Sequence, residues 1–147
     1  YAFSDQSPES VYENRNWYDV NVKDAHDADT IRGDVHLGLG VVLSDQGLRP
    51  DDYDAWEVST LRERGNSNIK VTDEEIKLGK KALREFKRFL KEGTLQVSPN
   101  PKRPREKYGR ILGPWRLVKS DGTIIRVADY AKEKGWERSN LFELDRE

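Results

Sequence analysis

One long amphipathic helix separates two groups of short β-strands in this sequence. Thr72 and Glu75 have the spacing of a capping box at its start, and Gly93 ends the run. Apolar residues recur between these limits at helical spacing, at Ile76, Leu83, Phe86, Phe89 and Leu90. The sequence therefore predicts a helix of about five turns, whose lysines and arginines form an exposed basic face.

Short strands are predicted before this helix. Apolar and polar residues alternate from Trp17 onwards, which favours a half-buried strand, and a second strand is expected from Thr30 through Leu37. The Gly38-Leu39-Gly40 segment is typical of a tight turn. Extended structure is expected to resume over residues 41–43, before the polar residues 44–47 interrupt it.

More strands are predicted after the helix. Residues 95–97 and 111–118 are expected to be strands, joined by a cationic loop with three prolines. Asp121-Gly122 indicates a hairpin, and a short helix is expected from Val127 to Lys134, ended by Gly135. This order favours an α+β, mainly β fold: a five-stranded OB-type barrel with one long helix and one or two short helices.

The 147 residues suit one domain. We expect it to span residues 15–142, after a flexible leader or tag remnant over residues 1–14 and before a C-terminal tail over residues 143–147. No apolar run approaches the roughly 20 residues that a membrane-spanning helix needs. We therefore expect a monomer with no membrane partner, and because no targeting segment is visible the localisation stays open.

The residue types in the chain limit the kinds of metal site that it can form. The chain has no Cys and only two histidines, His26 and His36, so a Cys-ligated zinc site is excluded and His-rich sites are disfavoured. Both histidines are expected to be ordinary strand or turn residues. A metal would therefore have oxygen ligands, which favour calcium, magnesium or manganese.

Charge is distributed unevenly along the chain, although the net charge is only −1. Residues 1–60 hold 4 Lys/Arg and 13 Asp/Glu, whereas residues 61–120 hold 17 Lys/Arg and 7 Asp/Glu. An acidic first part beside a basic middle fits a metal site joined to a polyanion-binding surface. Because solvated faces give the same pattern, charge alone does not decide between these interpretations.

Three short segments carry residues suited to phosphate chemistry. The first is His26-Asp27-Ala28-Asp29-Thr30, between two predicted strands. The second runs from Arg49 to Glu57 and includes Asp54, and the third is Lys107-Tyr108-Gly109-Arg110. Each segment alone says little, because Asp clusters commonly mark turns and arginines commonly lie on surfaces. Their order and spacing carry the prediction.

In this order, the segments resemble the staphylococcal nuclease (thermonuclease) family, whose pattern is a DGDT-like turn, then R-x4-D-x2-E, then a basic loop ending K-Y-G-R. The resemblance covers about residues 16–136, and the segment around Gly38-Leu39-Gly40 is most similar to bacterial and phage members. It implies an OB-fold endonuclease that hydrolyses phosphodiester bonds of DNA, RNA or both. The implied cofactor is calcium, with magnesium or manganese as substitutes.

The resemblance also implies which residues bind the metal and the phosphate. Asp29 and Asp54 would bind the metal through their carboxylates, and Ala55 through its main-chain carbonyl. Arg49 and Arg110 would hold the scissile phosphate. Two guanidiniums and a divalent ion stabilise the negative charge that develops on phosphate oxygens during attack, which is the chemistry that such a set provides.

Three further residues complete the implied site. Glu57 would hold the attacking water and accept its proton, as a carboxylate near a metal can do. Lys107 and Tyr108 would contact a neighbouring phosphate of the bound strand. The loop over residues 102–107 is expected to add phosphate contacts that give affinity without sequence specificity.

Some residues depart from the family pattern and leave a second function open. The chain has Ala28, Pro50, Asp51, Asp52 and Trp56 where the family has other residues. Asp51 and Asp52, like Asp27, are expected to be solvated or turn carboxylates rather than ligands. The alternative function is a catalytically silent OB-type module that binds nucleic acid or protein.

A third interpretation is disfavoured by its context. Pro50-Asp51 followed by Glu75-Ile76-Lys77 spells the sparse signature of PD-(D/E)xK nucleases. That signature places its Glu and Lys on a strand, whereas here they begin a capped helix.

Overall fold

A computed structural model describes residues 15–56, 61–64, 67–70 and 72–138. The described elements, in chain order, are β1 (Tyr18–Asp27), β2 (Thr30–Gly38), β3 (Val41–Arg49), β4 (Leu61–Arg64), β5 (Ser67–Lys70), α2 (Asp73–Leu90), β6 (Gly93–Val97), β7 (Ile111–Leu112), β8 (Trp115–Lys119), β9 (Ile124–Arg126) and α3 (Val127–Lys134). The leader predicted over residues 1–14 and the tail over 143–147 lie outside these described residues.

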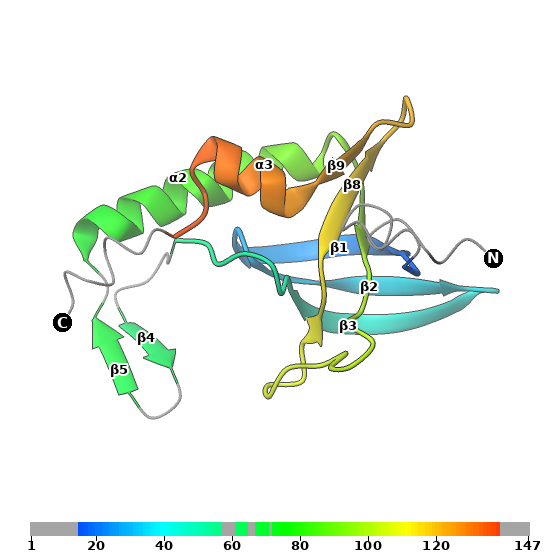
Figure 1. Cartoon of the computed structure of the whole chain (residues 1–147), viewed down its shortest axis with the longest axis horizontal. Coiled ribbons are helices and arrows are strands. Elements are labelled where there is room, and N and C mark those ends of the chain that lie inside the picture. Colours follow the sequence, from blue (N-terminus) through cyan, green and yellow to red (C-terminus); the bar gives the residue numbers. More distant parts are fainter. Residues whose placement is uncertain (1–14, 57–60, 65–66, 71, 139–147) are drawn as a thin grey trace, which may run out of the picture.

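The described part of the chain is a mixed α+β protein built on one curled sheet (Figure 1). The strand order is β7-β3-β2-β1-β6-β8-β9, and a separate hairpin pairs β4 with β5. All neighbours in the main sheet are antiparallel except β3 and β7, which are parallel. α2 packs against β1 and β6, and α3 packs against β8 and β9.

The main sheet has seven strands, so the expected number of five is wrong. The predicted strand over residues 111–118 is broken into β7 and β8 at Gly113-Pro114, where proline has no N–H for a strand ladder. A Cβ on Gly113 would lie only 2.0 Å from the Ser98 carbonyl oxygen, so the backbones meet too closely there for another residue. The β4–β5 hairpin was not predicted.

The strand pattern before the helix is confirmed with one correction. Residues 44–47 do not interrupt the third strand, because β3 continues to Arg49. Asp45 instead forms a bulge: its φ is 54°, and its N–H donates to Asp34 Oδ1 at 2.9 Å. The polar residues therefore bend β3 without ending it.

The long helix begins where the capping residues predict. Thr72 Oγ1 accepts the Glu75 N–H at 3.2 Å, and the cationic side chains of α2 are exposed. The Glu75 side chain itself is fully buried and pairs with Arg138, with 3.5 Å between Oε2 and Nε. A residue predicted for the helix cap thus also joins α2 to the segment that follows α3.

Aromatic side chains fill the space between the helices and the sheet. Phe86 of α2 stacks on Trp115 of β8, with ring centroids 6.0 Å apart. Trp136 meets the edges of Phe86 and Phe89 at 5.8 and 5.9 Å. The prediction that Trp115 belongs to the core is confirmed, since it is fully buried. These contacts hold both helices on one face of the sheet.

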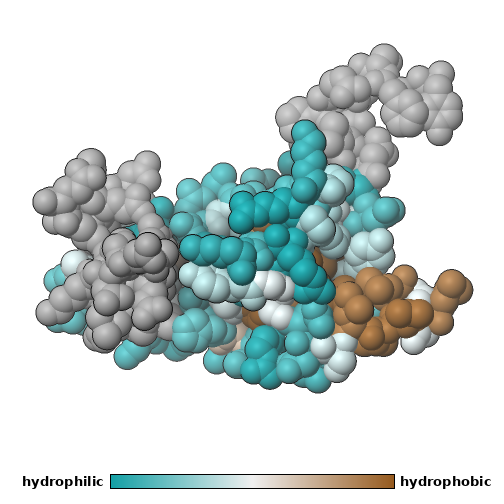
Figure 2. Space-filling view, turned by 90° about the horizontal axis from the view of Figure 1, so that it is seen from below, coloured by the Kyte–Doolittle hydropathy of each residue, from teal (hydrophilic) through white to brown (hydrophobic). Residues whose placement is uncertain are grey.

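The tip of the β2–β3 hairpin is apolar and exposed. Figure 2 shows it as a hydrophobic patch at one end of the molecule, formed by Leu37, Leu39, Val41 and Val42. The predicted turn is confirmed, with positive φ angles at Gly38, Leu39 and Gly40. Among the described helices, none is both long and apolar enough to cross a membrane.

Candidate functional site

The two-residue turn between β1 and β2 directs Asp29 inward. Its side chain is only 4% exposed. Oδ1 accepts the Thr30 hydroxyl at 3.1 Å, and Oδ2 accepts the Ala55 N–H at 2.9 Å. The small Ala28 fits this turn with its side chain fully buried. The predicted site residue is therefore held in a fixed position by the turn and by a segment 26 residues later.

Asp27 is a turn carboxylate, one of the two roles predicted for it. It is 5% exposed, and its Oδ1 accepts the Asp29 N–H at 3.2 Å across the β1–β2 turn. The β1–β2 pairing is irregular between Ala25 and Asp27, where the strand enters this turn. Asp51 and Asp52 are exposed, as predicted.

The segment after β3 is anchored on both sides. β3 ends at Arg49, before the proline at position 50. The Tyr53 hydroxyl then donates to the Ala28 carbonyl in the β1–β2 turn. On the other side, the Trp56 indole N–H donates to the Gly135 carbonyl at 2.9 Å. Trp56, which departs from the family pattern, is thus a buried anchor of this segment.

One of the extra acidic residues of this segment, Asp52, has a raised pKa. Desolvation, and then the charge of the adjacent Asp51, raise the pKa of Asp52 to about 6. The Asp51 carboxylate accepts a hydrogen bond from the Asn100 amide at 3.2 Å. Both side chains lie outside the group of contacts around Asp29.

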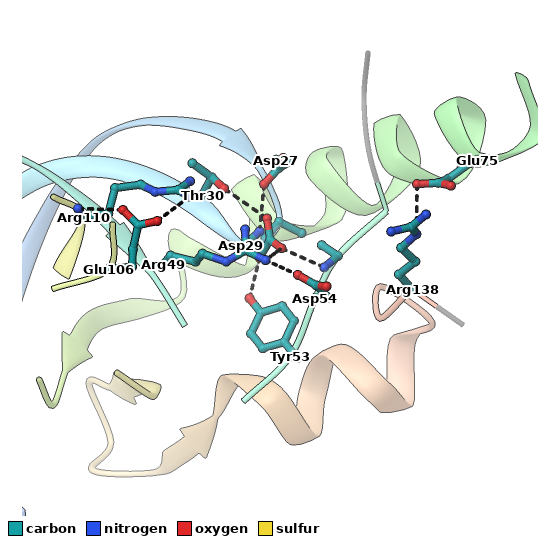
Figure 3. A network of polar contacts seen from close by, with 12 residues as sticks. Asp27, Asp29, Thr30, Arg49, Tyr53, Asp54, Glu75, Glu106, Arg110 and Arg138 are labelled. Carbon is teal, nitrogen blue, oxygen red and sulfur yellow. Dashed lines mark hydrogen bonds and ion pairs between the residues drawn. The ribbon is translucent and has the colours of Figure 1, made fainter. Parts of the chain in front are cut away.

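Arg49 joins the two carboxylates that were predicted to bind metal. Its Nη2 contacts Asp54 Oδ1 directly and lies 3.4 Å from Asp29 Oδ2 (Figure 3). Burial alone would raise the pKa of Asp29, but the Asp27 carboxyl, the Arg49 charge and the Ala55 N–H together hold that pKa below its usual value. Asp29 therefore remains anionic at neutral pH.

Glu106 positions Arg110, and sequence reasoning missed it. Its Oε2 accepts Arg110 Nη2 at 3.1 Å, while its Oε1 accepts the N–H groups of Tyr108 at 2.9 Å and of Arg110 at 3.0 Å. Gly109 completes the tight turn with a φ of 83°. Burial would raise the pKa of Glu106, but the hydrogen bond from Arg110 lowers it below its usual value. A carboxylate four residues before the arginine was the available signal.

Gly47 leaves room on β3 for the Arg110 side chain. A Cβ on Gly47 would lie 2.9 Å from Arg110 Cγ, so the Arg110 stem crosses β3 at this glycine. Alternate residues of a strand share a face, and they lie about 7 Å apart. Arg110 therefore extends over the same face of β3 as the Arg49 side chain. Both arginine side chains are 26% exposed, which leaves them open to a bound anion.

The other residues predicted for the site are Lys107, Tyr108, Ala55 and Glu57. Lys107 and Tyr108 are exposed on the loop that carries Arg110. Ala55 lies opposite Glu137 in an isolated antiparallel bridge. The hydrogen bonds of this bridge are made by the residues on either side of the pair, so they do not involve the Ala55 carbonyl. Glu57 lies outside the described residues, and its predicted role stays a prediction.

The donor set around Asp29 fits a hard cation. Asp29 Oδ2 and Asp54 Oδ1 both contact Arg49 Nη2, so the two oxygens converge on one point, as ligands of a single ion do. Within the described ranges, however, no group of three or more His, Asp or Glu residues is placed to hold a metal. Within the described residues, the acidic side chains that meet at this point are therefore Asp29 and Asp54, and both are paired with Arg49.

Neither a scan against known protein families nor a search of curated proteins found a match for this chain. The function is therefore argued from the geometry of the site.

Proposed function

We propose that this protein is a monomeric, metal-dependent nuclease of the staphylococcal nuclease type, built on an OB-type barrel. Its substrate would be DNA, RNA or both, and its cofactor calcium, with magnesium or manganese as substitutes. The observation that carries the proposal is the pairing of Arg49 with the carboxylates of Asp29 and Asp54, together with the Arg110 stem that crosses β3 at Gly47, two residues before Arg49. The sequence motifs that select these residues add independent support.

The roles of the residues follow from the chemistry of phosphodiester hydrolysis. Arg110 and Arg49 would each present a planar fork of donors to the phosphate oxygens, on which negative charge increases as water attacks. Glu106 would keep the Arg110 fork in place, and Glu57 would accept the proton of the water. The ion held by Asp29 and Asp54 would supply further positive charge at the same oxygens.

One assay tests the proposal. Labelled single-stranded DNA, duplex DNA and RNA are incubated with the protein in calcium, magnesium or manganese, and with a chelator. We expect cleavage that needs an ion and is lost in Glu57→Ala. Arg110→Lys should be about 100-fold slower or more, because loss of one preorganised donor costs about 3 kcal/mol.

Arg84→Lys is the matched control for Arg110→Lys. Arg84 is exposed on α2, outside the loop that carries Arg110, so its replacement should leave turnover near the wild-type value. Wild-type turnover in Arg110→Lys, or cleavage that persists in the chelator, would contradict the proposed mechanism.

The second candidate function is a catalytically silent module that binds nucleic acid. Its support is the pairing of Arg49 with both carboxylates, which satisfies these charges internally, together with the acidic residues Asp51 and Asp52 beside them. The same assay separates the two candidates: binding of nucleic acid without cleavage in any ion supports the module.

A further inference from the structure

A cavity of about 310 Å³ is lined in part by Arg110. Its walls include Asp24 and His26 of β1, Arg32 of β2, Gly47 of β3, and Tyr108 with Arg110 from the loop. Thr30 also lines it, and the Thr30 hydroxyl donates to Asp29. A nucleic-acid strand held at Arg110 therefore has this cavity as its immediate neighbour.

One wall of the cavity is suited to stacking. The Tyr108 side chain is 63% exposed, which is unusual for an aromatic residue that serves only the core. Arg110 Cζ lies 5.7 Å and Lys107 Nζ lies 5.1 Å from the centre of its ring. An exposed ring beside cations is the arrangement on which nucleobases stack in single-strand binding proteins.

The turn that carries Tyr108 is formed before any ligand arrives. Glu106 Oε1 accepts the Tyr108 N–H at 2.9 Å, and Arg105 Nη1 donates to the Gly109 carbonyl at 2.7 Å. The main chain of this turn is therefore closed by two hydrogen bonds. A pre-formed turn loses little backbone freedom when a base stacks on its tyrosine, which favours binding.

The side chains of β1 that line the cavity can recognise the edge of a base by hydrogen bonding. Asp24 and His26 are exposed side chains of β1 that line the cavity. A carboxylate accepts a hydrogen bond from the amino group of cytosine, whereas thymine presents a carbonyl oxygen at the same place. Asp24 is the carboxylate among the residues that line this cavity, which makes it the discriminating group. The cavity volume lies at the small end of the range for small-ligand sites.

We propose that this cavity is a base-binding subsite, in which the nucleobase next to the scissile phosphate stacks on Tyr108 and presents an amino group to Asp24. This inference rests on the proposed function, because it takes Arg110 as a phosphate ligand. It differs from the family-derived role of Tyr108, which is contact with a phosphate. It makes Asp24 a residue that determines base preference.

Binding of short single-stranded DNA, measured by fluorescence anisotropy in a chelator, tests the subsite without cleavage. Labelled tetranucleotides carry an abasic unit at each position in turn. We expect one position at which base removal raises the dissociation constant roughly 10-fold, within the range found for losing a base–aromatic stack. Tyr108→Phe should keep this difference, whereas Tyr108→Ala should remove it.

Asp24→Asn tests the discriminating group. The wild type should bind cytosine more tightly than thymine at the sensitive position, and Asp24→Asn should lose that preference. Asp19→Asn is the matched control, because Asp19 is exposed on the same strand but does not line this cavity. Equal affinity for intact and abasic oligonucleotides at every position would overturn the subsite. Equal weakening by Tyr108→Phe and Tyr108→Ala would also overturn it, since the hydroxyl would then be the important group.

The two proposals fail in different ways. Base-dependent binding without cleavage in any ion would leave the subsite standing and refute the nuclease. Ion-dependent cleavage with no effect of base removal would refute the subsite alone.

Discussion

Arg49 is the residue on which both candidate functions depend. Its guanidinium neutralises Asp29 and Asp54, the two carboxylates proposed to bind the ion, and it is also proposed to bind the phosphate. The ion and Arg49 therefore compete for the same two oxygens. If the ion takes them, the guanidinium is released toward the substrate, which would couple the two binding events.

Removal of Arg49 should therefore strengthen ion binding. We expect Arg49→Ala to bind calcium about 10-fold more tightly, because a charge at contact distance in a partly exposed site is worth about 1 kcal/mol or more. Isothermal titration of the protein without nucleic acid measures this change. Arg103→Ala serves as the control. Unchanged or weaker calcium binding in Arg49→Ala would show that the two carboxylates are not the ion's ligands.

The sequence predicted which residues of the site carry charge but not what holds them in position. Asp29, Asp54, Arg49 and Arg110 follow from motif spacing, and the first three are in direct contact. Glu106 was missed because its importance comes from three contacts made within a turn whose shape the sequence does not state. Gly47 and Tyr53 were missed for a similar reason, since each acts on a segment far along the chain.

At the level of elements, the glycines at positions 33 and 47, in the neighbouring strands β2 and β3, have different roles. A Cβ on Gly33 of β2 would lie 2.4 Å from the Asn21 carbonyl oxygen of β1, so a side chain there would push two strands apart. The nearest atom to a Cβ on Gly47 is instead Cγ of the Arg110 side chain, which can move. Gly33 allows β1 and β2 to pair closely, whereas Gly47 leaves space for the Arg110 side chain.

Two alanine substitutions separate these roles. Gly33→Ala should lower the free energy of unfolding by about 1–3 kcal/mol, as overpacking of a rigid site does. Gly47→Ala should leave stability nearly unchanged but reduce nucleic-acid cleavage by displacing Arg110. Urea unfolding and turnover are measured for both variants. A large stability loss in Gly47→Ala with normal turnover per folded molecule would contradict the assignment.

Helices and turns were predicted correctly where neighbouring residues in the sequence determine them. The prediction failed where the backbone responds to a contact with a residue far along the chain. The long helix, the β2–β3 turn and the short helix ended by Gly135 all follow from nearby residues. The bulge at Asp45 depends on the Asp34 carboxylate of the neighbouring strand. The break at Gly113 depends on the approach of the Ser98 carbonyl. Neither partner can be identified from alternation along the chain.

For the whole molecule, Asp29 makes the free energy of unfolding depend on pH. Its pKa is lowered by folding, so the anionic form favours the folded state. The stabilisation is fully present above the pKa of the unfolded chain, about 3.9 for an aspartate. It is lost as the pH falls through the lower pKa of the folded protein. Protonation there weakens the tie between the β1–β2 turn and the segment at Ala55.

Asp29→Asn should therefore be less stable than the wild type at pH 7, by about 1–3 kcal/mol, and should lose less stability on acidification. Urea unfolding at pH 7, 5 and 3 measures both effects. Glu133→Gln, an exposed position on α3, is the control. Parallel loss of stability with falling pH in the wild type and Asp29→Asn would contradict the link.

The anchoring of the segment at Trp56 also bears on how the protein is made. The Trp56 indole bonds to Gly135, 79 residues later, and Arg138 N–H bonds to the Asp54 carbonyl at 2.7 Å. During translation, these partners leave the ribosome long after the residues that they support. The main-chain support of Asp54 is therefore complete only when residues 135–138 have emerged, so the candidate site cannot assemble fully on the nascent chain before that point.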